Sequence, residues 1–594
     1  MLFRQALADV LPGHRIVLDR PRSWNVGDIA FPCFAIAKAL GQDPNSLAKS
    51  LANRLNICGA DLVAVGPYLN LKLQPAVRAR FLLEAILGSA PYGGEAFNNK
   101  TVLIEYSSPN IAKLFTIGHL RSTMIGHSLA QVNRYLGCNV VRLNHIGDWG
   151  TQFGAMLAAY KSWAELENPE LKLDFPWADE VPEKLRSPLY RLFQLYVRFH
   201  AAELDDPALH DEAKLWFVRL EAGDAEALRL WSWFRKISIV EFMRTYKRLG
   251  VSFDNMDMGE AFYQEQIAPT LHLLENLGLL TEGTNGASII DLEDVGINTP
   301  CLVRKSDGGS IYATRDIAAA IFRRKTWNFH KCIYVVGSDQ LLHFKQLFAV
   351  MEKIDPWYRD RMLHVPFGMI SLPDGKMSTR KGNVIFLEDV LDEAVSRVMA
   401  IIEEKNPELP NKSVVAEMLG VGAVIFFNAL NDRVKSITFN WDHVIALDGD
   451  TGPYVQYAHA RIISLLCKAG DGWAAKARPI AAVKSDSAAV LYPDIKIPES
   501  MSGLEDGPAQ ALLFELAFMP EVYRIMQRDN MGTVLARHLL CIAKAFSNFY
   551  TNCPILWEKN SEAVRCSRLT LCVATARVLR QGLFILGIQA PETM

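Results

Sequence analysis

The stretch TVLIEYSSPNIAKLFTIGHLRSTMIGHSLAQVNRYLGCNVVRL, residues 101–143, decides the fold class of this chain. Residues 102–104 are a short apolar run that predicts a buried strand. From Gly118 to Leu136 apolar residues recur at helical spacing, and Gly137 then supplies a stop signal. Residues 140–143 predict a second strand. This order of strand, helix and strand indicates a parallel sheet with helices on its faces.

A second set of the same kind occurs later in the chain. Residues 332–337 are strand-like, 341–354 helix-like and 363–370 strand-like again. Residues about 156–295 lie between the two sets and are rich in Leu, Trp and charged residues, which predicts a mainly helical insertion. The fold class that we predict is therefore α/β, with a Rossmann-type parallel sheet split by a helical insertion.

Two further regions flank this predicted sheet. Helical spacing at 34–40 and strand-like alternation at 68–73 predict a small α+β domain at the N-terminus. Turn-forming residues at 90–100 predict a linker after it. From about residue 391 the pattern is helical, with a predicted long loop at 468–511. The boundaries that we predict are 1–98, 99–390, 391–447 and 448–594.

Length and composition agree with several soluble domains. The 594 residues exceed the roughly 250–300 at which one hydrophobic core stops growing. Half of them are apolar and 22% are charged, which excludes a disordered or collagen-like chain. No apolar run approaches the roughly 18 residues that span a membrane, so we expect a cytoplasmic protein. The ten cysteines form no C-x-x-C pair, which predicts reduced packing residues and no structural zinc.

Net charge gives only a local indication of a nucleic-acid partner. The whole chain carries −2. The tail 531–594, however, has seven basic and three acidic residues, a net of +4 (7 − 3). Such a tail is usually a solvated helical face, but it can also mark a phosphate-binding surface.

The first motif with chemical meaning is Thr116-Ile117-Gly118-His119, where the first strand passes into its helix. The carboxyl edge of a parallel sheet binds ligands, and a helix start offers free backbone N–H groups to phosphate. Gly118 would let a nucleotide approach the backbone, and His119 could donate a hydrogen bond to a phosphate oxygen. Taken alone, such a pair at a helix start is more often only a helix cap.

The second motif is DGKMSTRKG, residues 374–382, after the last predicted strand of the sheet. Three cations and two hydroxyl groups on a glycine-flanked loop suit a clamp that closes over a triphosphate. An exposed basic turn is the alternative.

The two motifs together, in this order and at opposite ends of a split sheet, resemble the signatures of class I aminoacyl-tRNA synthetases. Further stretches resemble arginyl-tRNA synthetases and cover nearly the whole chain: SPNIAK at 108–113, GHLRST at 118–123, NHIGDWGTQFG at 144–154, YATRD at 312–316, VGSDQ at 336–340 and TGPYVQYAHAR at 451–461. The N-terminal segment is similar to that family's additional domain, which contacts the tRNA elbow. The helical C-terminal region resembles its anticodon-binding bundle.

This resemblance implies a reaction in two steps. Arginine and ATP give arginyl-adenylate and pyrophosphate, with Mg²⁺ accompanying the phosphates. Arginine then passes to the 3′-terminal ribose of tRNA(Arg), and activation is expected to depend on tRNA. The implied partners are L-arginine, ATP and tRNA(Arg), with no membrane, and we expect a monomer.

The family's motifs imply an arginine pocket, and physical need agrees with it. A guanidinium requires carboxylates in fork geometry together with neutral hydrogen-bond partners. We assign Asp316 and Tyr312 to the guanidinium, since four residues separate them on a predicted helix. Glu105, Asn110 and Gln340 would orient the amino and carboxylate groups. The alternative for Asp316 is a buried salt bridge to Arg315 or another internal arginine.

The same motifs imply an ATP site. His119 would hold the α-phosphate region, and Lys376 and Ser378 the pyrophosphate. Thr116, Gly118 and Met377 complete the two signatures.

Two positions depart from the class pattern. Thr116 stands where that pattern has His, and Thr379 stands where it has a Lys. The second departure should weaken pyrophosphate stabilisation. We expect Lys113, just before the first signature, to compensate for it.

The C-terminal bundle is expected to read the anticodon. Tyr454 and Tyr457 are three residues apart on a predicted helix, and Arg461 follows one turn later. Unpaired bases can stack on such aromatic rings. Tyr550 and Met594 are further candidates, although Tyr550 could equally be packed inside a helix bundle.

Two other functions fit parts of this pattern. A small-molecule nucleotidylyltransferase shares the Gly-His helix start, but it needs neither an N-terminal domain nor a long helical bundle. A tRNA-binding paralog without catalysis would lose the phosphate-binding groups, whereas this chain keeps His119, Lys376 and Ser378 together with Tyr312 and Asp316. Pyrophosphate exchange with arginine, with and without tRNA, separates the three functions.

Overall fold

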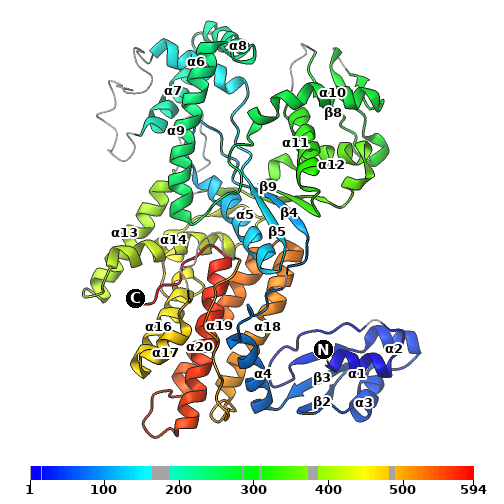
Figure 1. Cartoon of the computed structure of the whole chain (residues 1–594), viewed down its shortest axis with the longest axis vertical. Helices are drawn as coiled ribbons and strands as arrows, with labels where there is room; N and C mark the ends of the chain where they lie inside the picture. The colour runs from blue at the N-terminus through cyan, green and yellow to red at the C-terminus, as the bar shows by residue number, and fades with distance from the viewer. Residues whose placement is uncertain are drawn as a thin grey trace.

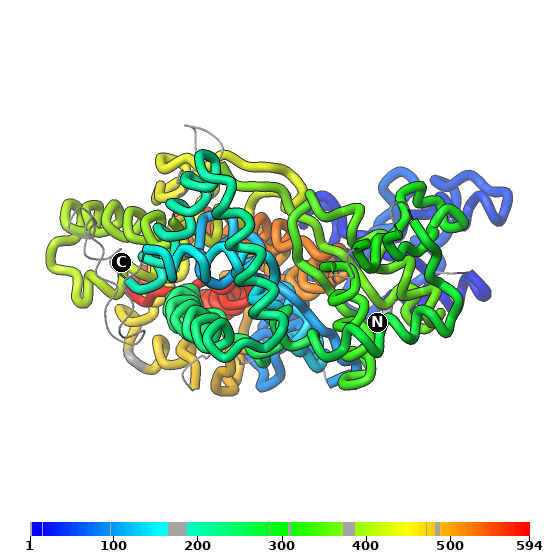
Figure 2. Tube along the Cα trace, turned by 90° about the horizontal axis from the view of Figure 1, so that it is seen from above, coloured from blue at the N-terminus to red at the C-terminus, as the bar shows by residue number. Residues whose placement is uncertain are grey.

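The computed structural model describes residues 2–14, 16–95, 97–163, 187–283, 286–306, 311–371, 386–480 and 488–594. A parallel sheet lies at the centre, with two groups of helices above it and a helical bundle below (Figure 1). Seen from above, the N-terminal domain lies toward one end of an elongated molecule and α13 (Leu387–Lys405) toward the other (Figure 2). The α/β class predicted from the sequence is confirmed.

The N-terminal domain is a three-stranded antiparallel sheet with three helices. Its sheet order is β1-β3-β2. The elements are α1 (Leu2–Val10), β1 (Ile29–Pro32), α2 (Phe34–Leu40), α3 (Pro44–Arg54), β2 (Ala60–Val65) and β3 (Tyr68–Leu73). The predicted helix at 34–40 and strand at 68–73 are confirmed, and a separate apolar core holds them together. Helix α4 (Pro75–Leu87) then leads out of the domain.

The central sheet has the order β10-β9-β4-β5, with all neighbours parallel. The first half is β4 (Thr101–Glu105), α5 (Ile117–Tyr135) and β5 (Asn139–Leu143). The second half is β9 (Lys331–Gly337), α12 (Leu341–Ile354) and β10 (Met362–Phe367). Because β4 and β9 are neighbours and their connections leave in opposite directions, the crevice beyond their carboxyl ends is where an open α/β sheet binds ligands.

The strand predicted over 363–370 is two strands. After β10 ends, β11 (Ile370–Ser371) pairs in parallel with β12 (Ile437–Thr438). Residues at the end of the sheet are thereby tied to the start of the C-terminal region.

The insertion is mainly helical, as predicted, but it closes with a small sheet. Its helices are α6 (Thr151–Trp163), α7 (Pro188–Ala202), α8 (Ala208–Glu221), α9 (Ala225–Leu249), the 3₁₀ helix η3 (Glu260–Gln266) and α10 (Ile267–Asn276). An antiparallel sheet of β6 (Thr281–Glu282), β7 (Ser288–Ile290) and β8 (Cys301–Arg304) follows, and then α11 (Tyr312–Trp327). These strands are too short to show alternation in the sequence.

The C-terminal region is helical. It contains α13, α14 (Lys412–Leu430), α15 (Trp441–Val444), α16 (Gly452–Ala469), α17 (Asp471–Ala477), α18 (Gly507–Asp529), α19 (Gly532–Asn552) and α20 (Glu562–Ile585). The loop predicted over 468–511 is wrong in part, because α17 lies within it and α18 begins before its end.

Helix α14 is long and apolar enough to cross a membrane by length and composition alone. Its apolar stretch is 61% buried inside the protein, and the helix packs against α13, α16 and α19. Such burial is typical of a core helix.

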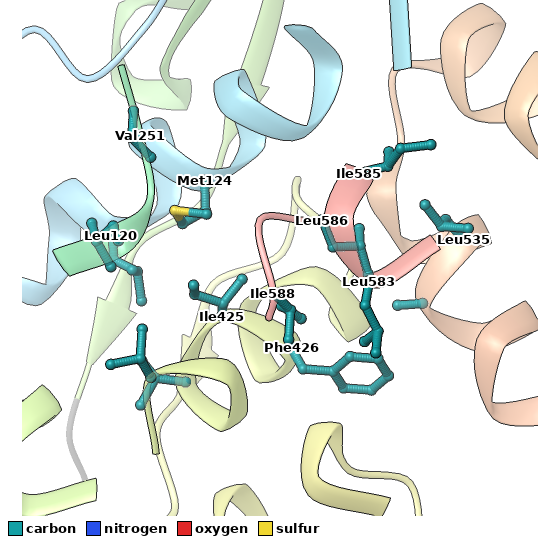
Figure 3. Close-up of a cluster of buried hydrophobic side chains, with 14 of the residues drawn as sticks. Leu120, Met124, Val251, Ile425, Phe426, Leu535, Leu583, Ile585, Leu586 and Ile588 are labelled. Atoms are coloured by element: carbon teal, nitrogen blue, oxygen red, sulfur yellow. The ribbon is translucent and has the colours of Figure 1, made fainter. Parts of the chain in front are cut away.

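One continuous core joins the sheet to the bundle. Figure 3 shows Leu120 and Met124 of α5 facing Ile425 of α14 and the segment that follows α20, which includes Leu586 and Ile588. The helix that follows β4 is therefore packed directly on the C-terminal region.

Part of the positive charge of the tail is buried. Three of its seven basic residues, Arg568, Arg577 and Arg580, are buried. Arg577 donates to the carbonyls of Lys476 and Pro493, and Arg580 pairs with Glu592. These guanidinium groups hold loops in place, so the net charge of the tail overstates its attraction for phosphate.

Candidate active site and anticodon-binding surface

The start of α5 is organised by Thr116 and His119. The Thr116 backbone N–H donates to His119 Nδ1 at 3.0 Å, and Thr116 Oγ1 lies 3.0 Å from the same nitrogen. Because Nδ1 accepts, we assign the ring proton to Nε2. Burial, with a further contribution from Lys113, lowers the pKa of His119 to about 4, so the ring is neutral at neutral pH. His119 is thus both a helix cap and a donor.

Gly118 and Lys113 lie beside this ring. A Cβ built at Gly118 would lie 3.4 Å from Thr116 Oγ1, so the packing of the protein does not itself require glycine there. Lys113 Nζ donates to Gln152 Oε1 at 3.3 Å and lies 4.9 Å from the centroid of the Tyr196 ring. The insertion therefore holds this ammonium close to the helix start.

The loop between β4 and α5 is strained. Ser107, Ser108 and Ala112 have φ values of 71°, 47° and 60°, a left-handed region that residues other than glycine rarely adopt. The Ser107 backbone N–H donates to Ser122 Oγ at 2.9 Å and helps to hold this conformation. Such strain persists only where the surrounding structure holds the backbone in place, and it is commonly found at functional sites.

Both flanks of residues 372–385 lie against the helix start. Phe386 forms a β-bridge with Thr116, and the Leu387 N–H donates to the Phe115 carbonyl at 2.9 Å. On the other side, a Cβ at Gly118 would lie 4.0 Å from Met369 Cε. The predicted site residues Lys376, Met377 and Ser378 lie outside the described residues.

Asp316 is held by two histidines. Its carboxylate accepts a hydrogen bond from His343 Nε2 at 2.7 Å, and His145 Nε2 lies 3.9 Å away. Burial raises the pKa of Asp316, but the hydrogen bond and the charges of His343, His145 and Arg323 outweigh it, so the pKa is lowered. The carboxylate is therefore ionised and oriented.

The internal salt bridge considered for Asp316 is found instead at Glu105. Glu105, the last residue of β4, forms an ion pair with Arg323 of α11, and both side chains are buried. Burial would lower the pKa of Arg323, but Glu105 raises it well above its usual value. The structure thus gives Glu105 a buried partner that the sequence did not indicate.

Two of the other predicted pocket residues, Asn110 and Tyr312, lie beside the segment that follows β5. The side chain of Asn110 lies over Gly147, where a Cβ would come within 1.9 Å of Asn110 Oδ1. A Cβ at Gly150 would lie 3.6 Å from the hydroxyl of Tyr312, whose side chain is 59% exposed. Gln340 ends the short 3₁₀ helix η6 (Ser338–Gln340) after β9 and is exposed.

Sequence reasoning missed Glu260, at the start of η3. Its Oε2 is buried and has no hydrogen-bond partner. Burial raises the pKa of Glu260 to about 8, and the charges of Asp316 and Asp148 raise it further while Arg315 opposes them. A nearby cation would favour its ionised form. The insertion contains many acidic residues, and no local sequence pattern distinguishes Glu260 from the others.

Aromatic and cationic groups gather on the C-terminal bundle. Arg461 Nη2 donates to the hydroxyl of Tyr457 at 2.6 Å on α16. The same guanidinium lies 4.6 Å from the ring centroid of Tyr457 and 5.3 Å from that of Tyr550 on α19. Both rings remain partly exposed, at 37% and 38%. Tyr457, Arg461 and Tyr550 are called the tyrosine–arginine cluster below.

Two predicted anticodon residues lie elsewhere. Tyr454 is partly buried against the main core, near the Thr451 cap of α16. Met594 packs against the core between α13 and α14, and its carbonyl accepts from Asn406 Nδ2 at 3.3 Å. Of the face predicted for Tyr454, Tyr457 and Arg461, the structure shows a direct contact between the last two, and the role of Tyr454 stays a prediction.

Three family models match the chain. They are tRNA synthetases class I (R), catalytic domain, over residues 82–441; the DALR anticodon binding domain over 455–594; and the arginyl tRNA synthetase N terminal domain over 1–73.

Known proteins match over nearly full length. The arginine–tRNA ligase of Streptococcus thermophilus is 41% identical over 97% of this chain and 96% of its own, and arginine–tRNA ligase 2 of Bacillus anthracis is 42% identical over 97% and 95%. Among solved structures, the arginyl-tRNA synthetase of Thermus thermophilus superposes with a TM-score of 0.79 at 26% identity, over 100% of this chain and 98% of that one.

Proposed function

Since this chain belongs to the arginyl-tRNA synthetase family and is an arginine–tRNA ligase, we propose that arginine and ATP react in the crevice beyond β4 and β9. The observation that carries this proposal is the position of residues 144–154. Gly147 packs against Asn110, Gly150 lies near the hydroxyl of Tyr312, and His145 Nε2 lies 3.9 Å from the carboxylate of Asp316. This segment therefore connects the phosphate-binding helix start to the acidic pocket.

Arginine would bind with its guanidinium toward Asp316, Glu260 and Tyr312. The guanidinium would give the buried Oε2 of Glu260 a hydrogen-bond partner, and its positive charge would favour the ionised form of this carboxyl group. The ammonium of lysine cannot reach all the oxygens that the planar guanidinium of arginine would bind, so some of them would stay without a donor. A site built on hydrogen bonds discriminates against an analogue that lacks them by a factor of roughly 10⁴–10⁵ in kcat/KM. Asn110 and Gln340 would orient the amino and carboxylate groups, and Glu105 would act through the ion pair with Arg323.

The chemistry needs positioning rather than a protein nucleophile. The arginine carboxylate attacks the α-phosphorus of ATP, pyrophosphate leaves, and a terminal ribose hydroxyl of tRNA then attacks the adenylate. His119 Nε2–H would donate to the α-phosphate region, and Gly118 would leave room for adenosine. Lys376, Met377 and Ser378 would close over the pyrophosphate, with Lys113 as a further cation. Mg²⁺ would enter as the counter-ion of the ATP phosphates.

The C-terminal bundle would hold the anticodon of tRNA(Arg). The tyrosine–arginine cluster offers two ring faces and a cation within one patch, which suits stacking of unpaired bases. Tyr454, on the same helix as Tyr457, and Met594, at the end of the chain, remain candidates for further contacts with the tRNA. We further propose that the enzyme works in the cytoplasm as a monomer.

Pyrophosphate exchange tests the proposed activation step. With L-arginine and ATP, exchange should require tRNA(Arg), and L-lysine should not replace L-arginine. Exchange with arginine in the absence of tRNA would contradict the proposed dependence on tRNA. Failure of exchange under every condition would contradict the proposed assignment of the site.

A further inference from the structure

Three metal-ligating side chains meet between α18 and α19, within the C-terminal bundle. Glu515 lies on α18, while His538 and Cys541 are three residues apart on α19. One ligand atom from each side chain lies within 4.8 Å of the others. His538 is buried, with 6% exposed, whereas Cys541 is exposed to solvent. The proposed reaction uses none of these groups.

The protonation of His538 is fixed by its surroundings. Its Nε2 lies 2.9 Å from the backbone carbonyl of Glu515, which can only accept, so Nε2 carries the proton and Nδ1 a lone pair. In many proteins a carbonyl that accepts from the other ring nitrogen orients a metal-binding histidine in this way.

Two electron-rich atoms consequently face each other. His538 Nδ1 lies 3.6 Å from Glu515 Oε2. That buried carboxylate oxygen has no hydrogen-bond partner. A lone pair opposite an orphaned carboxylate oxygen is unfavourable unless a cation lies nearby.

Arg20, from the N-terminal domain, supplies a positive charge at this point. Its Nη2 lies 2.9 Å from Glu515 Oε2, but its N–H is not directed at the oxygen, so the contact is an ion pair without a hydrogen bond. The guanidinium also lies 4.4 Å from the ring centroids of both Phe514 and Phe518. These rings would retain Arg20 even if its contact with Glu515 were lost.

We propose that Glu515, His538 and Cys541 form an exchangeable site for Zn²⁺, in competition with Arg20. Zinc at about 2.0–2.3 Å from its N, O and S ligands places them roughly 3.3–3.8 Å apart in a tetrahedron. The 3.6 Å between His538 Nδ1 and Glu515 Oε2 already fits this spacing, and Cys541 Sγ, within 4.8 Å of a ligand atom of each, would move closer on binding. Water would complete the coordination.

Apolar contacts, rather than the ion, hold the two helices together, since residues of both belong to the main core. Zinc binding would instead neutralise Glu515 and deprotonate Cys541, because only the thiolate ligates. Its occupancy would therefore weaken the ion pair between the N-terminal domain and the bundle.

Cobalt titration of the metal-stripped, reduced full-length protein tests this site. One equivalent of Co²⁺ should give the strong visible bands of tetrahedral coordination and a thiolate charge-transfer band, and Zn²⁺ should displace both. Cys541→Ser should abolish the charge-transfer band. Cys467→Ser is the matched control, since Cys467 is an exposed thiol on α16, and it should keep the wild-type spectrum.

Affinity measurements complete the test. Glu515→Gln and His538→Asn should each weaken Zn²⁺ binding by about tenfold or more, as loss of a ligand generally does. Arg20→Gln should strengthen it, because the competing cation is gone. Thermal unfolding would verify that each variant is folded. Absence of the charge-transfer band in the wild-type protein, or unchanged binding in Cys541→Ser, would overturn the proposal.

Discussion

At the scale of single residues, His119 uses its two ring nitrogens for different tasks. Nδ1 accepts from the Thr116 backbone and so closes the first turn of α5. Nε2 then carries the proton and remains a donor over the whole range in which the ring is neutral, above a pKa of about 4. The threonine at 116 thus makes the cap that fixes the tautomer of the following histidine.

Asp316→Asn should impair arginine use selectively. The substitution removes the charge that we propose faces the guanidinium, and a hydrogen bond to a charged group is worth about 1.5–3 kcal/mol. The value of kcat/KM for arginine should fall roughly 10- to 150-fold, while KM for ATP should stay near that of the wild type. Steady-state aminoacylation at varied arginine measures this.

A surface carboxylate provides the control for that change. Asp294→Asn removes an exposed partner of Lys353 and should leave arginine kinetics unaltered. An unchanged KM and kcat for arginine in Asp316→Asn would show that Asp316 does not contact the substrate.

Lys113→Ala should depress adenylate formation as severely as Lys376→Ala. Each substitution removes a cation proposed to face the phosphates, and loss of one such group costs about 10²–10³ in rate. Pyrophosphate exchange in the presence of tRNA measures the effect. Lys161→Ala, which breaks an ion pair with Glu226 on the insertion, is the control. A near-wild-type rate at saturating ATP would contradict the role of Lys113.

At the scale of elements, Arg121 locks α5 to the segments that follow β10 and α14. It is fully buried, and it donates to the carbonyls of Gly368, Lys435 and Asp432. Burial lowers the pKa of Arg121 to about 10, with Asp432 opposing, so it stays charged at neutral pH. One side chain thereby aligns the helix start with the strand that precedes residues 372–385.

Arg121→Ala should destabilise the protein strongly. It leaves three backbone carbonyls without their donor in a buried site, which costs about 3–5 kcal/mol in the free energy of unfolding. Chemical denaturation followed by tryptophan fluorescence should show an unfolding midpoint at a lower denaturant concentration than in the wild type. Arg244→Ala, at a side chain that is 68% exposed, should leave the transition in place. Equal stability of the two variants would refute the locking role.

Tyr550→Ala should weaken tRNA binding without affecting arginine. Loss of one stacking surface costs roughly 1–3 kcal/mol, so KM for tRNA should rise about 5- to 150-fold. Trp557→Ala removes another exposed aromatic ring of the bundle and serves as the control. Filter binding with labelled tRNA distinguishes the two variants. Equal losses in both would indicate a general effect on the bundle rather than on the tyrosine–arginine cluster.

At the scale of the whole molecule, the segment after α20 connects the bundle to α5. Gln456 and His459 of α16 bond to the carbonyls of Gln589 and Pro591. A Cβ at Gly587 would lie 2.6 Å from Met124 Cε and 3.0 Å from His127 Cδ2 on α5. The helix that carries Tyr457 and Arg461 is therefore linked through this segment to the helix that begins at Thr116, across the core of Figure 3.

Gly587→Ala should disturb both stability and activation. Its φ of 82° already disfavours a side chain, and the clash with α5 adds about 1–3 kcal/mol. Gly223→Ala is the matched control, since φ there is 80° and a Cβ would meet nothing within 4 Å. The temperature of thermal unfolding and the rate of tRNA-dependent pyrophosphate exchange should both fall further in Gly587→Ala than in Gly223→Ala. Equal behaviour would show that only backbone strain matters.

The order of strands and helices and the position of the first signature were predictable from the sequence. Strand 102–104, the helix from Gly118 and the strand at 140–143 each follow from local periodicity, which reflects backbone geometry and burial of one face. The short strands β6–β8 and helix α17 were not predictable, because two to seven residues carry too little of a repeat.

Only the tertiary structure decided which charged groups meet. The residues that pair are remote in sequence: Asp316 with His343, and Glu105 with Arg323. Glu260, near Asp316, is one of many carboxylates in the insertion, and nothing local distinguishes it. The same holds for Arg577 and Arg580, whose charge the sequence could count but not place. Local pattern determines which face of an element is buried; packing alone determines what that face touches.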